Sequence, residues 1–156
     1  MAALKKCFQI KSRDFIHAGE ASITVQNMLK QIGIDAALIR RVAICAYEGE
    51  MNVVMHGEDG TFCIEVDTEK IVLDIADQGP GIEDIEKAME KGYSTATEEY
   101  REMGFGAGMG LPNMETHSDR LDIDSEKGRG TRVMMQFSLS FGSPTNEGAN
   151  ETGQSA

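Results

Sequence analysis

The sequence contains no tryptophan, only 3 prolines and only 3 cysteines among its 156 residues. The cysteines, Cys7, Cys45 and Cys63, are odd in number and form no C-x-x-C pair. This excludes a disulfide framework and a four-cysteine zinc site, so we expect reduced thiols. The longest apolar run, Val42 to Tyr47, is far shorter than the about 20 residues that span a bilayer. Because the opening MAALKKCFQIK also lacks the apolar core of a signal peptide, we expect a cytoplasmic protein with no membrane partner.

Basic side chains are scarce relative to acidic ones, with 15 Lys and Arg against 26 Asp and Glu and a net charge of −11. A negative field of this size repels phosphate backbones and anionic lipid headgroups. The composition therefore excludes nucleic acid as a partner. The apolar share is 40%, and it rises to about half when glycine is counted, which is ordinary for a globular protein and excludes disorder throughout the chain.

The apolar residues change their period along the chain, which predicts both helices and strands around one core. Helices are expected at 14–33, 35–56, 82–92 and from about Leu111, and strands at 5–12, 61–66, 71–75, 121–123 and 133–139. Helices on one face of a mixed, mainly antiparallel sheet form an α/β two-layer sandwich, which is the predicted fold class. We expect residues 1–140 to form a single domain and residues 141–156, which offer nothing to bury, to form a disordered tail.

The predicted helix at 35–56 carries three polar residues on one face. Glu48, Asn52 and His56 are spaced four residues apart, so their side chains lie above one another, about 6 Å apart along the helix axis. A solvent-exposed stripe has the same spacing. The motifs that follow therefore decide between a surface and a site.

Two glycine motifs lie further along the chain. Asp77-Gln-Gly-Pro-Gly81 follows the predicted strand at 71–75, so a carboxylate stands at a strand end where the backbone can approach a planar ligand closely. Residues 104–110 have glycine at every second position and precede the helix from Leu111, where freed N–H groups form an anion site for phosphates. A plain turn and a flexible linker are the alternative interpretations of the two motifs.

The order of these motifs is similar to that in the GHKL ATPase superfamily, which includes Hsp90, gyrase B, MutL and histidine kinases. The matching segments are Glu48-x-x-x-Asn52-x-x-x-His56-Gly57, Asp77-Gln-Gly-Pro-Gly81, Gly106-Ala-Gly-Met-Gly110 and Gly130-Thr131. Within the superfamily, the chain most resembles the bacterial anti-sigma-factor serine/threonine kinases and the stressosome switch kinases. It shares with them a single nucleotide domain and the run Gly92-Tyr93-Ser94-Thr95 before the glycine motif. The resemblance implies the Bergerat fold.

The resemblance also implies a role for each matching residue. Glu48 would be the catalytic carboxylate that orients or deprotonates the attacking group. Asn52 would ligate Mg²⁺, a hard ion that takes oxygen donors and is shared with the phosphates of ATP. Asp77 would bind the adenine amino group, with Thr131 supporting it through water. The glycines would line the nucleotide, namely Gly79 and Gly81 below the base and Gly106, Gly108 and Gly110 around the phosphates, with Lys91 or Arg101 as charge partners.

The sequence departs from the family pattern directly after Glu48, where Gly49-Glu50-Met51 replaces a small apolar pair. Gly49 weakens the helix. Glu50 lies about 200° around the helix from Glu48, so we do not expect it to replace Glu48 as the base. His56 is interpreted as a helix-end histidine rather than a site residue.

The function that the resemblance implies is an Mg·ATP-dependent serine/threonine protein kinase. Its substrate would be a STAS-type antagonist protein, and its effect would be to regulate a sigma factor or a stress-signalling switch. One alternative is an ATP-loaded anti-sigma factor that sequesters its partner without phosphoryl transfer, against which the carboxylate of Glu48 counts. The other is a stand-alone histidine-kinase-like ATPase domain, whose product would be acid-labile phosphohistidine. A homodimer is compatible with each.

Overall fold

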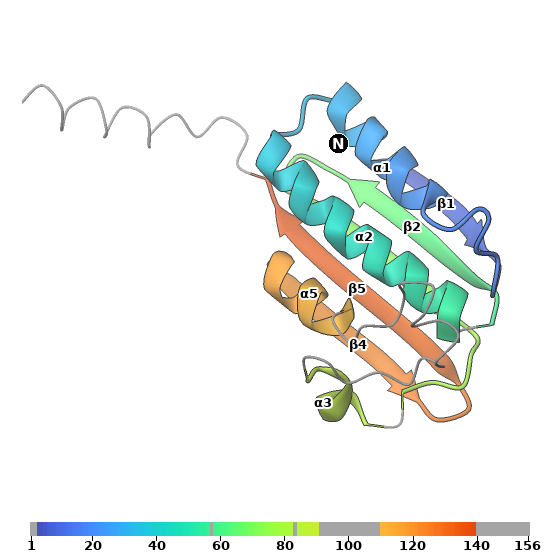
Figure 1. Ribbon diagram of the computed structural model, residues 1–156. Coiled ribbons are helices and arrows are strands. Elements are labelled where there is room, and N and C mark those ends of the chain that lie inside the picture. The colour runs from blue at the N-terminus through green and yellow to red at the C-terminus, as the bar shows by residue number, and fades with distance from the viewer. Residues whose placement is uncertain (1–2, 57, 83, 91–109, 140–156) are drawn as a thin grey trace, which may run out of the picture.

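The computed structural model describes residues 3–56, 58–82, 84–90 and 110–139. Five strands form one sheet in the order β1-β2-β3-β5-β4, and the four pairings between them are all antiparallel (Figure 1). The strands are β1 (Leu4–Ile10), β2 (Gly60–Val66), β3 (Lys70–Asp77), β4 (Arg120–Glu126) and β5 (Gly130–Ser138). The described helices are α1 (Glu20–Gln31), α2 (Ala36–His56), α3 (Ile85–Ala88) and α5 (Gly110–His117). None of these helices is both long enough and apolar enough to cross a membrane.

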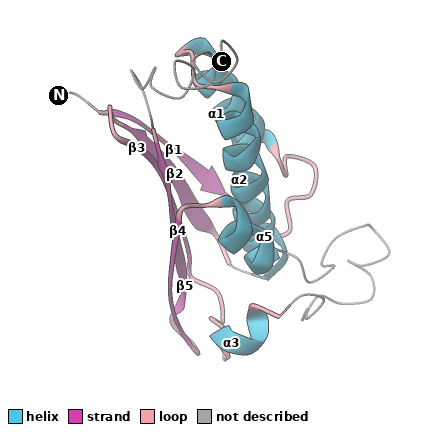
Figure 2. Cartoon of the chain, turned by 90° about the vertical axis from the view of Figure 1, so that its left-hand side faces the viewer, coloured by secondary structure: helices cyan, strands magenta, loops and turns pink. Residues whose placement is uncertain are grey.

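The helices α1, α2 and α5 cover one face of the sheet, as seen edge-on in Figure 2. The core lies between the two layers, where alternate residues of the central strands meet the apolar faces of the helices. The largest fully buried side chains include Phe62, Phe137, Leu29, Ile64, Ile71, Leu73, Met114 and Met135. This arrangement confirms the predicted α/β two-layer sandwich.

Helix α2 lies between α1 and α5 and crosses the middle of the sheet (Figure 1). Gly49 of this helix lies directly against β3, where a Cβ would overlap Cδ1 of Ile75. The helix-weakening glycine at this position is therefore what allows α2 to pack so close to the sheet. The close packing fixes the height at which the neighbouring Glu48 and Asn52 stand above the strands.

The start of α2 is as predicted, because Asp35 Oδ2 accepts hydrogen bonds from the backbone N–H groups of Ala37 (3.0 Å) and Leu38 (3.3 Å). The predicted start of α1 at Asp14 is wrong, since the helix begins at Glu20 after Gly19 with a φ of 95°. Asp14 instead accepts hydrogen bonds from His17. Phe15 and Ala18 pack against the core from a loop, so their helix-like spacing was misleading.

Glu50 is the charged residue that the fold buries most deeply among those described, with 2% of its surface exposed. Its Oε2 accepts hydrogen bonds from the N–H groups of Gly19 (2.9 Å) and Ala21 (3.4 Å). Its Oε1 accepts from the N–H (3.0 Å) and the hydroxyl (2.6 Å) of Ser22. Gly19 has no capping side chain of its own, so this carboxylate from α2 supplies the N-terminal cap of α1. As predicted, Glu50 points away from Glu48.

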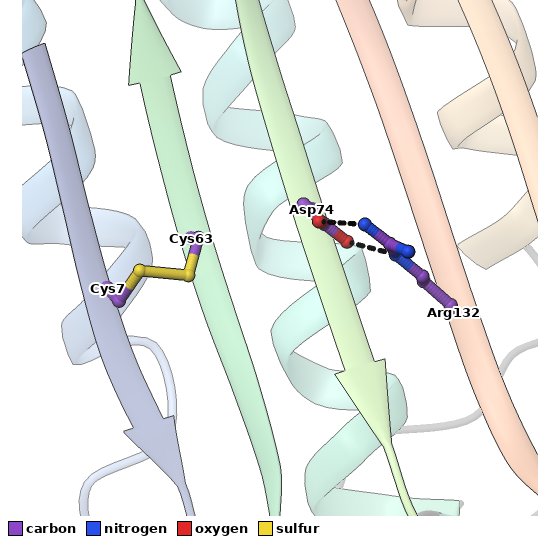
Figure 3. Close-up of a disulfide and its surroundings, with 4 residues drawn as sticks. All are labelled: Cys7, Cys63, Asp74 and Arg132. Carbon is purple, nitrogen blue, oxygen red and sulfur yellow. Dashed lines mark hydrogen bonds and ion pairs between the residues drawn. A yellow bond between two sulfur atoms is a disulfide. The ribbon is translucent and has the colours of Figure 1, made fainter.

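The prediction of three reduced thiols is wrong for Cys7 and Cys63. These residues lie opposite each other on β1 and β2 and form a disulfide, with their Cα atoms 4.1 Å apart (Figure 3). A spacing of 56 residues says nothing about which strands pair, so the sequence did not reveal the contact. Cys45 is free and buried, and burial raises the pKa of its thiol to about 12.

Candidate functional site

Helix α2 brings Glu48 and Asn52 to the N-terminal residue of α5, Gly110. A Cβ at Gly110 would lie 3.1 Å from Glu48 Oε2 and 3.4 Å from Asn52 Oδ1. Only a glycine leaves both side-chain oxygens unobstructed at this point. Of the other glycines predicted to wrap phosphates, Gly106 and Gly108 lie outside the described residues, as do Lys91 and Arg101.

The carboxyl group of Glu48 is partly buried, and this burial raises its pKa above the usual value for glutamate. The Nδ2 of Asn113, one turn into α5, donates a long hydrogen bond of 3.5 Å to Glu48 Oε1 and opposes that shift. A carboxylate with a raised pKa is a better proton acceptor than an ordinary one. Glu48 is therefore a partly desolvated carboxylate that is a stronger base than an exposed glutamate.

Asp77, the last residue of β3, begins a tight turn. Its Oδ1 accepts a 2.8 Å hydrogen bond from the N–H of Gly79. Burial raises the pKa of the Asp77 carboxyl, while N–H groups of Gly79 and Thr131 and the nearby His56 act in the opposite direction. The site thus holds a partly desolvated acceptor at the end of a central strand, as recognition of an amino group requires.

The β4–β5 hairpin contacts the turn after Asp77 and holds its backbone in place. Gly81 has a φ of 80°, and a Cβ there would overlap the backbone oxygen of Glu126. The N–H of Gly128 donates a 2.7 Å hydrogen bond to the carbonyl of Pro80. The left-handed conformation and this close contact together require glycine at position 81.

Ser125 connects this turn to Thr131. Its hydroxyl oxygen accepts a 2.7 Å hydrogen bond from the N–H of Ile82 and lies 2.8 Å from Thr131 Oγ1. Thr131 in turn pairs with Asp77 in the register of β3 and β5. The predicted base-binding residues therefore belong to one hydrogen-bonded unit.

His56 lies near Asp77, at the C-terminal end of α2. Burial lowers the pKa of its imidazole, and the charge of Asp77 only partly reverses this. The burial of His56 therefore favours the neutral form of its imidazole. The face that carries Glu48, Asn52 and His56 runs from the Gly110 contact to the Asp77 turn, a length of about 12 Å along α2.

No group of three or more His, Cys, Asp or Glu side chains within the described parts of the chain could hold a metal ion by itself. Asn52 is an oxygen donor beside the start of α5, a position that suits a divalent ion completed by phosphate oxygens. The residues present therefore fit an Mg²⁺ ion that arrives with a nucleotide. They do not form a resident metal cage.

Sequence reasoning missed two residues of the site, Asn113 and Ser125. The signal for Ser125 was available, because it follows Leu121 and Ile123 at alternate positions and so faces the helices rather than solvent. Asn113 has no comparable signal. Its contact with Glu48 spans 65 residues and depends on how α5 packs beside α2.

The amino-acid sequence of this chain matches a known protein family. A family model described as the histidine kinase-like ATPase domain matches residues 12–137. The match includes every residue of the site described above.

Several curated relatives carry the name anti-sigma F factor. The protein of Clostridium acetobutylicum is 31% identical over 121 residues, which cover 74% of this chain and 81% of that protein. That of Clostridium botulinum is 36% identical over 122 residues, covering 74% and 82%. Among solved structures, the mycobacterial sensor histidine kinase MprB aligns with 14% identity and a TM-score of 0.48, over 86% of this chain and 97% of that chain. From the family match and these relatives, the chain belongs to the histidine kinase-like ATPase domain family, the GHKL ATPases.

Proposed function

We propose that the chain is an Mg·ATP-dependent serine/threonine protein kinase that phosphorylates a STAS-type antagonist protein and thereby controls a sigma factor. The observation that carries the proposal is the Glu48 carboxylate, partly buried and with a raised pKa, beside Asn52 and Gly110. The relatives named anti-sigma F factor support a sigma factor as the regulated partner. The domain that performs this function spans residues 1–140. The tail at 141–156 lies outside the described residues.

The nucleotide would bind along the face of α2 that carries the site. Asp77 accepts a hydrogen bond from the adenine amino group, and Ser125 holds Thr131 beside it. Gly110 leaves room for the phosphates to approach Asn52, whose amide oxygen would hold Mg²⁺. A bound Mg²⁺ would supply neutralisation of the charge on the transferred phosphoryl group.

Glu48 would act on the hydroxyl of the protein substrate. Its carboxylate accepts the hydroxyl proton as the oxygen forms a bond to the terminal phosphorus of ATP. The bond from that phosphorus to the bridging oxygen breaks, and ADP leaves. Asn113 holds the carboxylate in orientation through its Nδ2. Transfer of this kind depends mostly on positioning and charge neutralisation, which one small domain can provide.

A second function is sequestration, in which the ATP-loaded chain binds a sigma factor without phosphoryl transfer. The names of the relatives favour it, because an anti-sigma factor acts by binding. Pure sequestration does not need a proton acceptor, so the environment of Glu48 favours the kinase. Both activities can belong to the same protein.

The product of the reaction tests the proposal. Purified chain, Mg²⁺ and labelled ATP are mixed with the STAS protein encoded nearest its gene, and the labelled residue is identified. We expect acid-stable phosphate on a serine or threonine of that protein. Absence of label would contradict the kinase, and an ATP-dependent complex with a sigma factor, mixed with the chain in a parallel reaction, would then support sequestration. Acid-labile phosphate on a histidine would instead support the histidine-kinase alternative.

A further inference from the structure

A groove of about 750 Å³ runs across the outer surface of the helical layer. Its floor is α2, which α1 and α5 flank on either side, as Figure 1 shows. The floor residues recur at helical spacing along one face of α2, namely Ala36, Ile39, Arg40, Ala43, Ile44 and Tyr47. Gln26 and Lys30 of α1 form one wall, and Asn113 and His117 of α5 form the other.

One end of the groove is part of the site described above. Glu48 and Asn113, which are in contact, both line it. A chain lying in the groove would thus bring its own atoms to the carboxylate of Glu48. The groove reaches Glu48 along the N-terminal half of α2, whereas Asn52 and the Asp77 turn lie on the C-terminal side of Glu48. The protein substrate and the nucleotide can therefore approach Glu48 from opposite directions.

The charge of the groove is opposite to that of the molecule. The chain carries a net charge of −11, yet the groove presents two cations, Lys30 and Arg40, against a single carboxylate, Glu48. In the part of the chain that the structure describes, neither Lys30 nor Arg40 forms an ion pair. The neighbouring Arg41 differs, because it bonds Asp119 and the carbonyl of His117. Two unpaired cations in an acidic protein form a complementary surface for an acidic ligand.

The floor between these charges is apolar. Ala43 and Ile44 are only partly covered, and Tyr47 is 40% exposed. Small and aromatic side chains on an exposed face provide a contact surface for an apolar side chain of a partner, with the tyrosine as an anchor of low conformational entropy. The ligand should therefore combine acidic and apolar residues, as a polypeptide segment does.

We propose that this groove docks an acidic, partly apolar segment of the protein that the kinase phosphorylates. Carboxylates of the segment pair with Lys30 and Arg40, an apolar side chain packs on Ala43 and Tyr47, and the acceptor hydroxyl reaches Glu48. This inference rests on the proposed function, which it extends to the recognition of the substrate.

Charge reversal in the groove tests the docking. The double variant Lys30→Glu with Arg40→Glu replaces both cations, and the control Lys5→Glu with Lys70→Glu makes the same change in net charge at exposed positions on the sheet. We expect the KM for the STAS protein to rise about tenfold or more in the groove variant, since two attractive pairs become repulsive. The Kd for ATP, measured without the partner, should match that of the control. Raising the salt concentration should raise the KM of the unmodified chain more than that of the groove variant.

The outcomes separate the two proposals. If the unmodified chain transfers phosphate and the groove variant has the KM of the control, the docking proposal is overturned while the kinase stands. If no transfer occurs, the kinase proposal is overturned, and the docking proposal is tested by fluorescence anisotropy with labelled STAS protein. Weaker binding of that protein by the groove variant alone supports the docking proposal, and equal binding by the groove variant and the control overturns it. Sedimentation of the chain by itself completes the test, because a change in oligomeric state in the groove variant would identify a second copy as the occupant and overturn the proposal.

Discussion

Replacement of Glu50 tests the most unusual interaction of the fold. The carboxylate is almost fully buried and accepts four hydrogen bonds from Gly19, Ala21 and Ser22, all at the start of α1. Glu50→Ala would remove all four at once and leave three N–H groups at a helix N-terminus without acceptors. Glu50→Gln would keep one oxygen but present an NH₂ group to donors.

The size of the effect follows from these contacts. Hydrogen bonds to a charged group contribute about 1.5–3 kcal/mol each but are not additive. Breaking a buried charged network costs about 3–5 kcal/mol, and losing a helix N-cap alone costs about 0.5–2 kcal/mol. We therefore expect Glu50→Ala to lower the free energy of unfolding by about 3–5 kcal/mol. For Glu50→Gln we expect a loss of about 2 kcal/mol, because one acceptor remains.

Urea unfolding followed by circular dichroism measures these losses, since the chain has no tryptophan for fluorescence. Glu65→Gln, an exposed change on the outer face of β2, is the control and should change the free energy of unfolding by less than about 0.5 kcal/mol. If Glu50→Ala does not fold, the free energy of unfolding of Glu50→Gln tests the role of Glu50. A free energy of unfolding for Glu50→Gln equal to that of the control would refute the account of Glu50 as the cap of α1.

Three further predictions concern the nucleotide. Asn52→Ala should abolish the Mg²⁺ dependence of ATP binding with the fold intact, and titration calorimetry with and without Mg²⁺ would show an unchanged dependence if the assignment were wrong. Asp77→Asn should weaken the preference for ATP over GTP in competition binding, and a full preference in the variant would contradict the role of Asp77. Because this acceptor must be ionised and its pKa is raised, the ATP affinity of the unmodified chain should fall with decreasing pH, with a midpoint above 3.8. Gly110→Ala should lower ATP affinity about tenfold or more, because the added methyl group lies 3.1 Å from Glu48 Oε2, and equal affinity would show that the phosphates do not pass this residue.

Much of the fold could be predicted from local pattern. The alternation of Phe62, Ile64 and Val66 and the cap at Asp35 depend on residues close in sequence, and both are as expected. The start of α1 could not be predicted in this way. Its N-terminal cap comes from Glu50, 31 residues from Gly19, so the signal is tertiary rather than local.

The same distinction applies to the candidate site. Glu48 and Asn52 share a helix face, so their proximity follows from the period of the helix. The disulfide of Cys7 with Cys63 depends on the pairing of β1 with β2, and the contact of Asn113 with Glu48 depends on the packing of α5 against α2. Neither contact could be predicted from the spacing of its residues in the sequence. The pairing of Ser125 with Thr131 is intermediate, because the short β4–β5 hairpin sets its register.

The central claim is that Glu48 is the proton acceptor of phosphoryl transfer. Its most direct test is the single-turnover rate of transfer from ATP to the STAS protein by Glu48→Gln, with Glu65→Gln as the control and the Kd for ATP measured on both. We predict that Glu48→Gln binds ATP within a few fold of the control and transfers phosphate at least about 10²-fold more slowly. A rate equal to that of the control would contradict the claim.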